Sequence, residues 1–267
     1  MTTFNCFREA KRLEIKALQR LESRGFPPPY AGRRPPFSLS LTRAAADQGL
    51  AIIAEYKRAS PSQGDIAPEL AAGRVARAYA EAGATAMSIL TEKSKFKGRL
   101  NFIREARAVP EAASLPLLRK DFIFDLLQVR ATAATPASAV LLIVGLTPSA
   151  ALLRQLREEA ENLGLEAVVE VLNETDLEIA RDSGAKIIQA NARDFADLSV
   201  DLRRSLSLAQ KHARAAGELW IAASGFNRPE ELRLAREAGF TAILAGTALM
   251  AGGQPAESLK KLRAGLG

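Results

Sequence analysis

The sequence is nearly devoid of two residue types that often carry chemistry. Its 267 residues include one cysteine, Cys6, and one histidine, His212. A single cysteine excludes an internal disulfide and a cysteine-rich zinc site, and a single histidine excludes a metal cage built from several histidines. Both residues fall in segments with helical patterns, so we expect neither to be catalytic. The composition therefore predicts no metal site.

Long apolar runs are also lacking. No stretch approaches the roughly 18 apolar residues that a membrane-spanning helix needs, and the N-terminus has no apolar core of a signal peptide. Hydrophobic residues still make up 48% of the chain and charged residues 25%, as is ordinary for a globular protein with a sizeable core. These features predict a cytoplasmic enzyme that is not attached to a membrane.

Basic residues outnumber acidic residues, but they are dispersed along the chain. The formal net charge is +7, and a basic protein can bind nucleic acid. The densest basic groups are only Arg33–Arg34 and Lys57–Arg58, and no aromatic RNA-binding motif or zinc finger accompanies them. A small anionic substrate accounts for these groups equally well, and we expect no nucleic-acid partner.

A repeating pattern dominates the chain after residue 50. Each unit of about 22 to 35 residues has a short apolar run followed by a helical pattern, which is typical of β/α units. The predicted strands span residues 51–56, 84–90, 115–119, 139–144, 167–171, 186–190, 219–223 and 241–245. The predicted helices span 68–82, 100–109, 125–135, 148–163, 174–183, 201–215, 229–238 and 255–266.

Residues 1–48 precede this pattern and read differently. An amphipathic helix is expected over 4–24, then a proline-rich linker, then a second short helix over 37–48. Eight largely apolar strands alternating with helices favour an α/β fold with a parallel sheet. We predict a (β/α)8 TIM barrel over 49–267 with an N-terminal helical extension over 1–48. An open doubly wound sheet is the alternative, but its usual glycine-rich loop after the first strand is missing.

Charged side chains gather where the predicted strands end. In a barrel these ends meet at one mouth, where the active site lies. Glu55 and Lys57 end the first strand, Lys120 follows the third, and Glu170 ends the fifth. Two lysines and two glutamates at one mouth indicate an acid–base set: crowding lowers the pKa of a lysine and burial raises that of a glutamate. A lysine that forms a Schiff base is the alternative.

The last two strand ends carry a different pattern. Ser224-Gly225 and Gly246-Thr247 follow the seventh and eighth strands, where this fold commonly binds phosphate. Four apolar residues near strand ends are candidates for a slot that holds a flat ring: Phe96, Phe122, Leu142 and Phe226. Trp220, inside the seventh strand, is interpreted as packing.

These residues together resemble the indole-3-glycerol phosphate synthase family. The resemblance covers about residues 50 to 251 in order, and the helical extension also matches. The segments that carry it are IIAEYKRASPSQGDI, SILTEKSKFKGRL, LPLLRKDFIFD, AVLLIVGLT, VVEV, GAKIIQANARD, ASGF and AGTALM.

The resemblance implies a reaction and a role for each site residue. The family closes the pyrrole ring of 1-(2-carboxyphenylamino)-1-deoxyribulose 5-phosphate to give indole-3-glycerol phosphate, CO2 and water in tryptophan biosynthesis, without cofactor or metal. Lys120 resembles the general acid, Lys57 the group that holds the substrate carboxylate, Glu170 the base or cation-stabilising group, and Glu55 the residue that orients the lysines. Asn191 and Arg193 would bind polar substrate atoms; Ser60, Ser224, Gly225, Gly246 and Thr247 would surround the ring and phosphate; and Phe96, Phe122 and Leu142 would form the ring slot.

The sequence departs from the family pattern at several places, of which the seventh loop is the most notable. Ala223 stands where the family usually has a glutamate before Ser-Gly. Other readings are another phosphate-binding barrel enzyme, either an isomerase or a Schiff-base lyase, and a phosphometabolite binder without catalysis. We expect a monomer without a fused partner domain.

Overall fold

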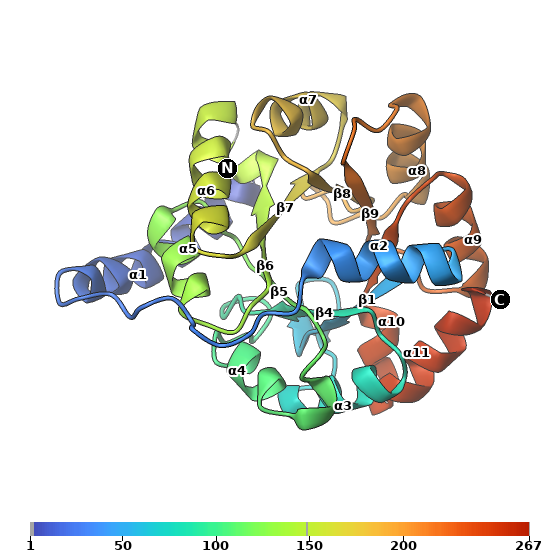
Figure 1. Ribbon diagram of the computed structural model, residues 1–267, viewed down its shortest axis with the longest axis horizontal. Helices are drawn as coiled ribbons and strands as arrows, with labels where there is room; N and C mark the ends of the chain where they lie inside the picture. The colour runs from blue at the N-terminus through green and yellow to red at the C-terminus, as the bar shows by residue number, and fades with distance from the viewer. Residues whose placement is uncertain (1–2, 148, 267) are drawn as a thin grey trace.

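Eight parallel strands close into a barrel (Figure 1). The computed structural model describes residues 3–147 and 149–266. Around the barrel, β1 neighbours β4 and β10, and the other strands follow in chain order. The strands are β1 Ala51–Tyr56, β4 Ala86–Leu90, β5 Leu117–Lys120, β6 Ala139–Ile143, β7 Glu166–Val171, β8 Ile187–Asn191, β9 Leu219–Ala223 and β10 Ala242–Ala245. The predicted (β/α)8 TIM barrel with an N-terminal helix is confirmed.

Helices follow the strands and cover the outside of the barrel. They are α3 Ala72–Glu81, α4 Phe102–Arg107, α5 Leu126–Ala133, α6 Ala150–Asn162, α7 Glu174–Asp182, α8 Leu202–Lys211, α9 Pro229–Glu237 and α11 Pro255–Arg263, with short 3-10 turns Pro110–Ala112, Val144–Leu146, Ala251–Gly253 and Ala264–Leu266. The sequence patterns predicted several helices too long; α3, for example, begins four residues after the expected start at Pro68. Pro148, the expected start of the fourth barrel helix, lies outside the described residues.

Besides the 3-10 turns, three short elements were not predicted. A hairpin of two-residue strands, β2 Ala59–Ser60 and β3 Gly64–Asp65, follows β1. A one-turn helix, α10 Thr247–Met250, follows β10. Elements of two to four residues are shorter than the periodicities on which the prediction rests. All three lie next to strand ends and so help to shape the mouth.

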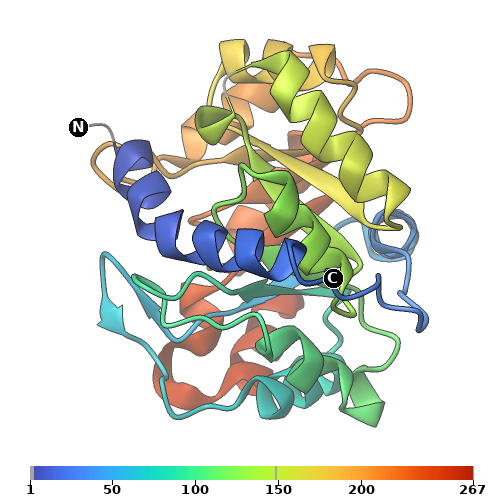
Figure 2. The same cartoon turned by 90° about the vertical axis from the view of Figure 1, so that its left-hand side faces the viewer.

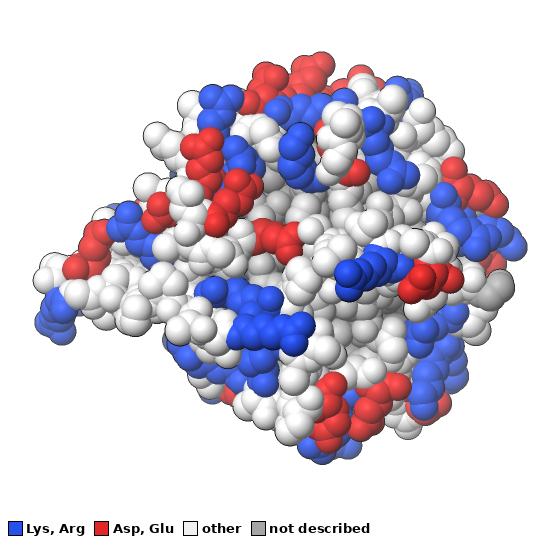
Figure 3. Space-filling view, in the orientation of Figure 1, with Lys and Arg blue, Asp and Glu red and all other residues white. Residues whose placement is uncertain are grey.

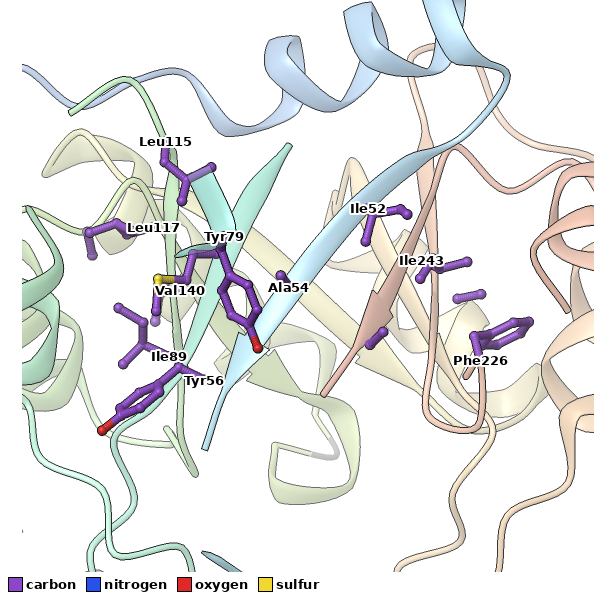
Figure 4. Packing of buried hydrophobic residues seen from close by; sticks show 14 of the residues in the cluster. Ile52, Ala54, Tyr56, Tyr79, Ile89, Leu115, Leu117, Val140, Phe226 and Ile243 are labelled. Carbon is purple, nitrogen blue, oxygen red and sulfur yellow. The ribbon is translucent and has the colours of Figure 1, made fainter. Parts of the chain in front are cut away.

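Alternation along each strand divides the core into two layers. On β1, Ala51 and Ile53 pack inside the barrel, whereas Ile52, Ala54 and Tyr56 pack outward against helices, as Figure 4 shows for this outer layer. Period-two side-chain direction produces this division. The outer layer also holds the predicted packing residue Trp220.

Two tyrosines of the outer layer tie β1 to its surroundings. The Tyr79 hydroxyl donates a hydrogen bond of 3.0 Å to the carbonyl oxygen of Glu55, and the Tyr56 hydroxyl donates one of 2.7 Å to the carbonyl of Leu70. Figure 4 shows both rings beside the strand. These bonds fix the carboxyl end of β1, which enters the mouth.

The two N-terminal helices pack at different places on the barrel: the first runs along its side beside α5, and the second crosses one end (Figure 2). The first, α1 Thr3–Glu22, reaches the end where β5 finishes, since Phe7 stacks on Phe122 with ring centroids 3.7 Å apart. The second, α2 Phe37–Gln48, lies at the other end: its backbone N–H of Ser38 donates to Glu166 at the start of β7, at 3.0 Å. A carboxylate at a helix N-terminus satisfies free N–H groups and complements the helix dipole.

A buried ionic network holds α1 to the barrel. Lys11 Nζ lies 2.6 Å from Asp121 Oδ1, just after β5, and Arg119 Nη2 lies 2.9 Å from Asp121 Oδ2. Thr91 donates to the same Oδ2 at 2.6 Å. Burial alone would raise the pKa of Asp121, but the charges of Arg119 and Lys11 lower this pKa to about 2. Asp121 is therefore ionised and joins α1 to the end of β5.

The surface carries charge of both signs. Figure 3 shows Lys and Arg interspersed with Asp and Glu on the face crossed by α2, without a continuous basic surface there. Within residues 3–147 and 149–266, the helices are all too short or too polar to traverse a lipid bilayer.

Lys11→Met should loosen α1, because it removes a buried cation from Asp121 while keeping the length of the side chain. We expect the free energy of unfolding to fall by about 2 kcal/mol at neutral pH, as for other hydrogen bonds to charged groups. The low pKa of Asp121 stabilises the fold above its unfolded-state pKa, so the difference between variant and wild type should shrink as the pH falls towards 2.

Denaturant unfolding between neutral and acidic pH measures this effect. Lys16→Met is the matched control, because Lys16 is an exposed lysine of the same helix and surface changes usually alter stability by less than about 0.5 kcal/mol. Equal stability of the two variants at neutral pH would contradict the role of Lys11.

Candidate active site

A cavity of about 440 Å³ opens at the carboxyl ends of the strands. Every barrel strand contributes to its lining, from Glu55 on β1 to Ala245 on β10. This is the end of a parallel barrel at which loops and strand ends meet, and where the fold places its active sites.

Glu55 is the centre of the charged side chains in the cavity. Its Oε1 lies 3.0 Å from Lys57 Nζ and its Oε2 lies 3.5 Å from Lys120 Nζ. Burial by itself would raise the pKa of Glu55, but the charges of the two lysines lower it below the ordinary value. Gly246 packs directly against this carboxylate, and a Cβ atom there would collide with it. Glycine at this position therefore makes room for the ionised Glu55.

Lys120 differs from the sequence-based expectation. A lowered pKa was predicted for a crowded lysine, and burial does act in that direction. The carboxylates of Glu55 and Glu170 outweigh it, so the pKa of Lys120 is raised above the ordinary lysine value. The prediction of a lowered pKa is wrong for Lys120, because the lysine faces two acids. The ammonium is protonated and can donate a hydrogen bond or a proton.

Glu170 has the opposite electrostatic state to Glu55. Burial raises its pKa above the ordinary glutamate value, against the lowering effects of the Lys120 charge and of the nearby amides of Asn191 and Gln189. Only 1% of Glu170 is exposed, yet it lines the cavity. The mouth thus holds one carboxylate kept ionised by lysines and a second that takes up a proton more readily.

The end of β8 contributes an amide and a guanidinium. Asn191 Oδ1 accepts a hydrogen bond of 3.0 Å from the backbone N–H of Arg193, and Arg193 Nη1 donates to the carbonyl of Leu198 at 2.7 Å. These bonds hold both side chains at the cavity, where they can meet polar atoms of a ligand.

The loops after β9 and β10 line the adjoining part of the cavity. Ser224 and Gly225 both adopt the left-handed backbone conformation, with φ of 66° and 87°, which is costly for serine and readily adopted by glycine. Gly246 and Thr247 lead from β10 into α10. The resulting tight turn brings backbone and hydroxyl groups to the cavity wall, a setting suited to an anion.

Aromatic rings line one side. Phe96 and Phe122 have centroids 6.3 Å apart, and Phe7 from α1 stacks on Phe122. Phe7 was missed by the sequence analysis because it precedes the barrel by more than forty residues and no local pattern links it to the mouth. Its place on the apolar face of the first helix was the available signal.

The prediction that Leu142 lines this slot is wrong. Leu142 is fully buried in the outer layer between the sheet and the helices, while its neighbours Leu141 and Ile143 face the cavity. Phe226 likewise packs in the outer layer. In the uniformly apolar run AVLLIV, nothing in the sequence marks which alternate residues point inward.

The other predicted site residues converge on this cavity. Ser60 does so from the β2–β3 hairpin, whose Asp65 pairs with Lys97 of the next loop at 2.5 Å. The predicted residues that line the cavity are Glu55, Lys57, Ser60, Phe96, Lys120, Phe122, Glu170, Asn191, Arg193, Ser224, Gly225, Gly246 and Thr247.

Comparison with known proteins identifies relatives over most of the chain. The family model for indole-3-glycerol phosphate synthase matches residues 9–262. The indole-3-glycerol phosphate synthase of Chloroherpeton thalassium is 37% identical over 258 residues, covering 94% of this chain and 95% of the relative. That of Salinibacter ruber is 40% identical over 238 residues, covering 88% and 85%.

Similar solved structures show the shared fold. A 3-hexulose-6-phosphate synthase superimposes with a TM-score of 0.63 at 18% identity, covering 82% of this chain and all of that structure. Thiamine phosphate pyrophosphorylase from Pyrococcus furiosus gives a TM-score of 0.60 at 17% identity, covering 82% and 96%. At such identities the likeness concerns the barrel alone.

Glu55→Gln should lower the pKa of Lys120, because it removes one of the two carboxylates that raise it. We expect the Lys120 ammonium to lose its proton at a lower pH than in the wild type. An NMR titration of labelled lysine side chains measures this directly.

Asp194→Asn is the control, since Asp194 lies near the mouth but pairs with Arg204 at 3.0 Å. This substitution should leave the titration of Lys120 unchanged. A Lys120 titration that is identical in Glu55→Gln and wild type would contradict the pairing.

Proposed function

Because the chain belongs to the indole-3-glycerol phosphate synthase family, we propose that the cavity at the barrel mouth carries out the reaction of this family. The family consists of carboxy-lyases of tryptophan biosynthesis that act on a phosphorylated small molecule. Lys120, Lys57 and Glu170 are proposed as the acid–base groups. The observation that carries the proposal is the buried Glu55 between two lysines, with Glu170 near enough to Lys120 to shift its pKa.

The reaction needs two proton donors and one acceptor. The aromatic carbon that bears the carboxylate attacks the ketone carbon, and the ketone oxygen gains a proton to become a hydroxyl. The carboxylate then leaves as CO2, and its bonding electrons restore the aromatic ring. The hydroxyl departs as water after a second protonation, and loss of a proton from the adjacent carbon completes the indole. The net uptake of one proton balances the loss of the carboxylate.

Lys120 is proposed as the donor to the ketone oxygen. Its raised pKa keeps it protonated at neutral pH, and its ion pair with Glu55 limits where the ammonium can lie. A preorganised cation at the place where negative charge develops lowers the activation barrier of the reaction. The same raised pKa disfavours the Schiff-base alternative, because a Schiff base needs the neutral amine.

Lys57 and Glu170 are proposed to complete the set. Lys57, on the other oxygen of Glu55, would hold the substrate carboxylate and supply the second proton. Glu170 would stabilise the cationic intermediate and accept the final proton, and its raised pKa suits a group that takes up a proton.

The remaining residues are proposed to bind the substrate. Phe96 and Phe122, together with Phe7, would hold the anthranilate ring between apolar surfaces. The phosphate and the polyol are assigned to the polar residues around the cavity, which are Ser60, Asn191, Arg193, Ser224, Gly225, Gly246 and Thr247.

Ala223 motivates a second candidate, a protein that binds the substrate without turning it over. Ala223 is buried and lines the cavity, so the family's usual carboxylate is missing there. Glu55 and Glu170 nevertheless supply the two carboxylates that the scheme above uses. We therefore favour turnover over binding alone.

The oligomeric state and location belong to the same proposal: a cytoplasmic monomer. Exposed large apolar side chains of the described residues are spread over α1, α2, α9 and the segment before α8 rather than gathered on one face. Sedimentation equilibrium should give a mass near the 28.7 kDa of the chain, and twice that mass would contradict the monomer.

Lys120→Met should lower turnover by about a thousandfold, because it deletes the proposed general acid, whose contribution is typically 10²–10⁴. The assay follows the fluorescence of indole-3-glycerol phosphate formed from the carboxyphenylamino-deoxyribulose phosphate. Wild-type turnover supports the function, and tight substrate binding without turnover would support the second candidate.

Lys93→Met is the matched control for the acid. Lys93 is an exposed lysine in the loop after β4 and does not line the cavity, so its substitution should leave the rate near that of the wild type. Circular dichroism checks that both variants are folded. A Lys120→Met variant that keeps most of its activity would overturn the assignment of the acid.

A further inference from the structure

Gln189 is a fully buried amide in the middle of β8. Its chain neighbours Ile188 and Ala190 pack in the outer layer, so its own side chain points into the barrel, as does that of Ile187. The surrounding interior is mainly apolar. A polar side chain at this depth is uncommon, and neither the sequence pattern nor the cavity lining marks it as functional.

The amide faces Glu170. The two residues are direct partners in the parallel ladder of β7 and β8, and Gln189 Nε2 donates a hydrogen bond to Glu170 Oε2. Among the described residues, the amide oxygen of Gln189 and the other carboxylate oxygen of Glu170, Oε1, have no hydrogen-bond partner. Glu170 itself lines the cavity; one of its oxygens is held by Gln189, while the other is buried without a hydrogen-bond partner among the described residues.

Stability alone gives no reason for an amide here. A buried carbonyl oxygen without a partner is unfavourable, and a methionine or leucine would fill the space without that penalty. Locally unfavourable polar groups of this kind are found where they serve function. Here the group that benefits is the carboxylate next to it.

We propose that Gln189 is a positioning residue for Glu170: its amide N–H holds one carboxylate oxygen, which favours the ionised form and leaves the other oxygen facing the substrate. The proposal rests on the role given to Glu170 above. Gln189 lies beside Glu170 on the neighbouring strand and does not itself line the cavity, so it acts through Glu170 and not on the substrate.

The charges around Glu170 explain why such a donor matters. Burial raises the pKa of Glu170, and the nearby Glu55 raises it further; Lys120 and the two amides lower it. The charged groups that share the cavity with Glu170 are Glu55 and Lys57 from the end of β1, Lys120 and Asp121 from the end of β5, and Arg193 after β8. Removing the Gln189 donor should therefore raise the pKa of Glu170.

The pH dependence of kcat/KM tests this proposal. If the ionised Glu170 is the active form, activity is lost as the pH falls through its pKa, so Gln189→Met should move the acidic limb to higher pH. On that limb we expect kcat/KM to fall about tenfold relative to wild type, as for the loss of a hydrogen bond to a charged group, and to approach the wild-type value at higher pH.

Ser88→Ala is the matched control. Ser88 is a fully buried polar residue on β4, and its hydroxyl has no hydrogen-bond partner among the described residues. Its substitution should leave the acidic limb in place. Gln189→Leu provides a second apolar variant should Gln189→Met fold poorly, and thermal unfolding of each variant identifies a purely structural effect.

A 13C NMR titration of the Glu170 carboxyl group gives a readout that does not need turnover, with Glu170→Gln used to assign the resonance. A raised pKa of Glu170 in Gln189→Met together with a shifted acidic limb is the expected result. An unchanged Glu170 titration, with only lower thermal stability, would overturn the role of Gln189. A wild type without turnover would overturn the proposed function, and the titration would still decide the question for Gln189.

Discussion

The mouth of the barrel depends on one buried charge, the carboxylate of Glu55. Two lysines at 3.0 and 3.5 Å keep it ionised, and without it they would be two like charges in a confined space. The chain around it is arranged accordingly. Gly246 leaves room for the carboxylate, and Tyr79 holds the carbonyl of the same residue from the outer layer. The carboxylate of Glu55 thus fixes the positions of both lysines and raises the pKa of Lys120, so that Lys120 is protonated and can act as an acid.

The end of β5 connects Glu55 to helix α1. Arg119, Lys120 and Asp121 are consecutive, and alternation sends them in different directions: Lys120 pairs with Glu55 in the cavity, while Arg119 and Asp121 pair with each other and with α1. The buried ion pairs between α1 and the barrel are thus made by the immediate neighbours of the proposed acid. A displacement of α1 would therefore move the residues on both sides of Lys120, and so would alter the position of Lys120 in the cavity.

Much of this arrangement follows from the sequence, and its failures have physical causes. Eight apolar runs with helical segments between them were enough for the barrel, and strand ends marked by Glu55, Lys120 and Glu170 predicted the mouth. The prediction for Leu142 was wrong because the sequence of a uniformly apolar strand does not indicate which side chains face inward. The pKa of Lys120 depends on distances to Glu55 and Glu170, which are tertiary. Phe7 and Gln189 were missed because one is remote in sequence and the other is hidden within an apolar strand.

Closure of the barrel has a consequence for folding during synthesis. β1 pairs with β10, so Ala51 meets Ala242 across almost the whole length of the barrel sequence. Until the last strand has emerged from the ribosome, β1 has an open edge whose N–H and C=O groups can pair with another chain. The completed barrel has no such edge. Pairing of β10 with β1 is therefore the step that closes this edge, which makes loss of β10 costlier to folding yield than its four residues imply.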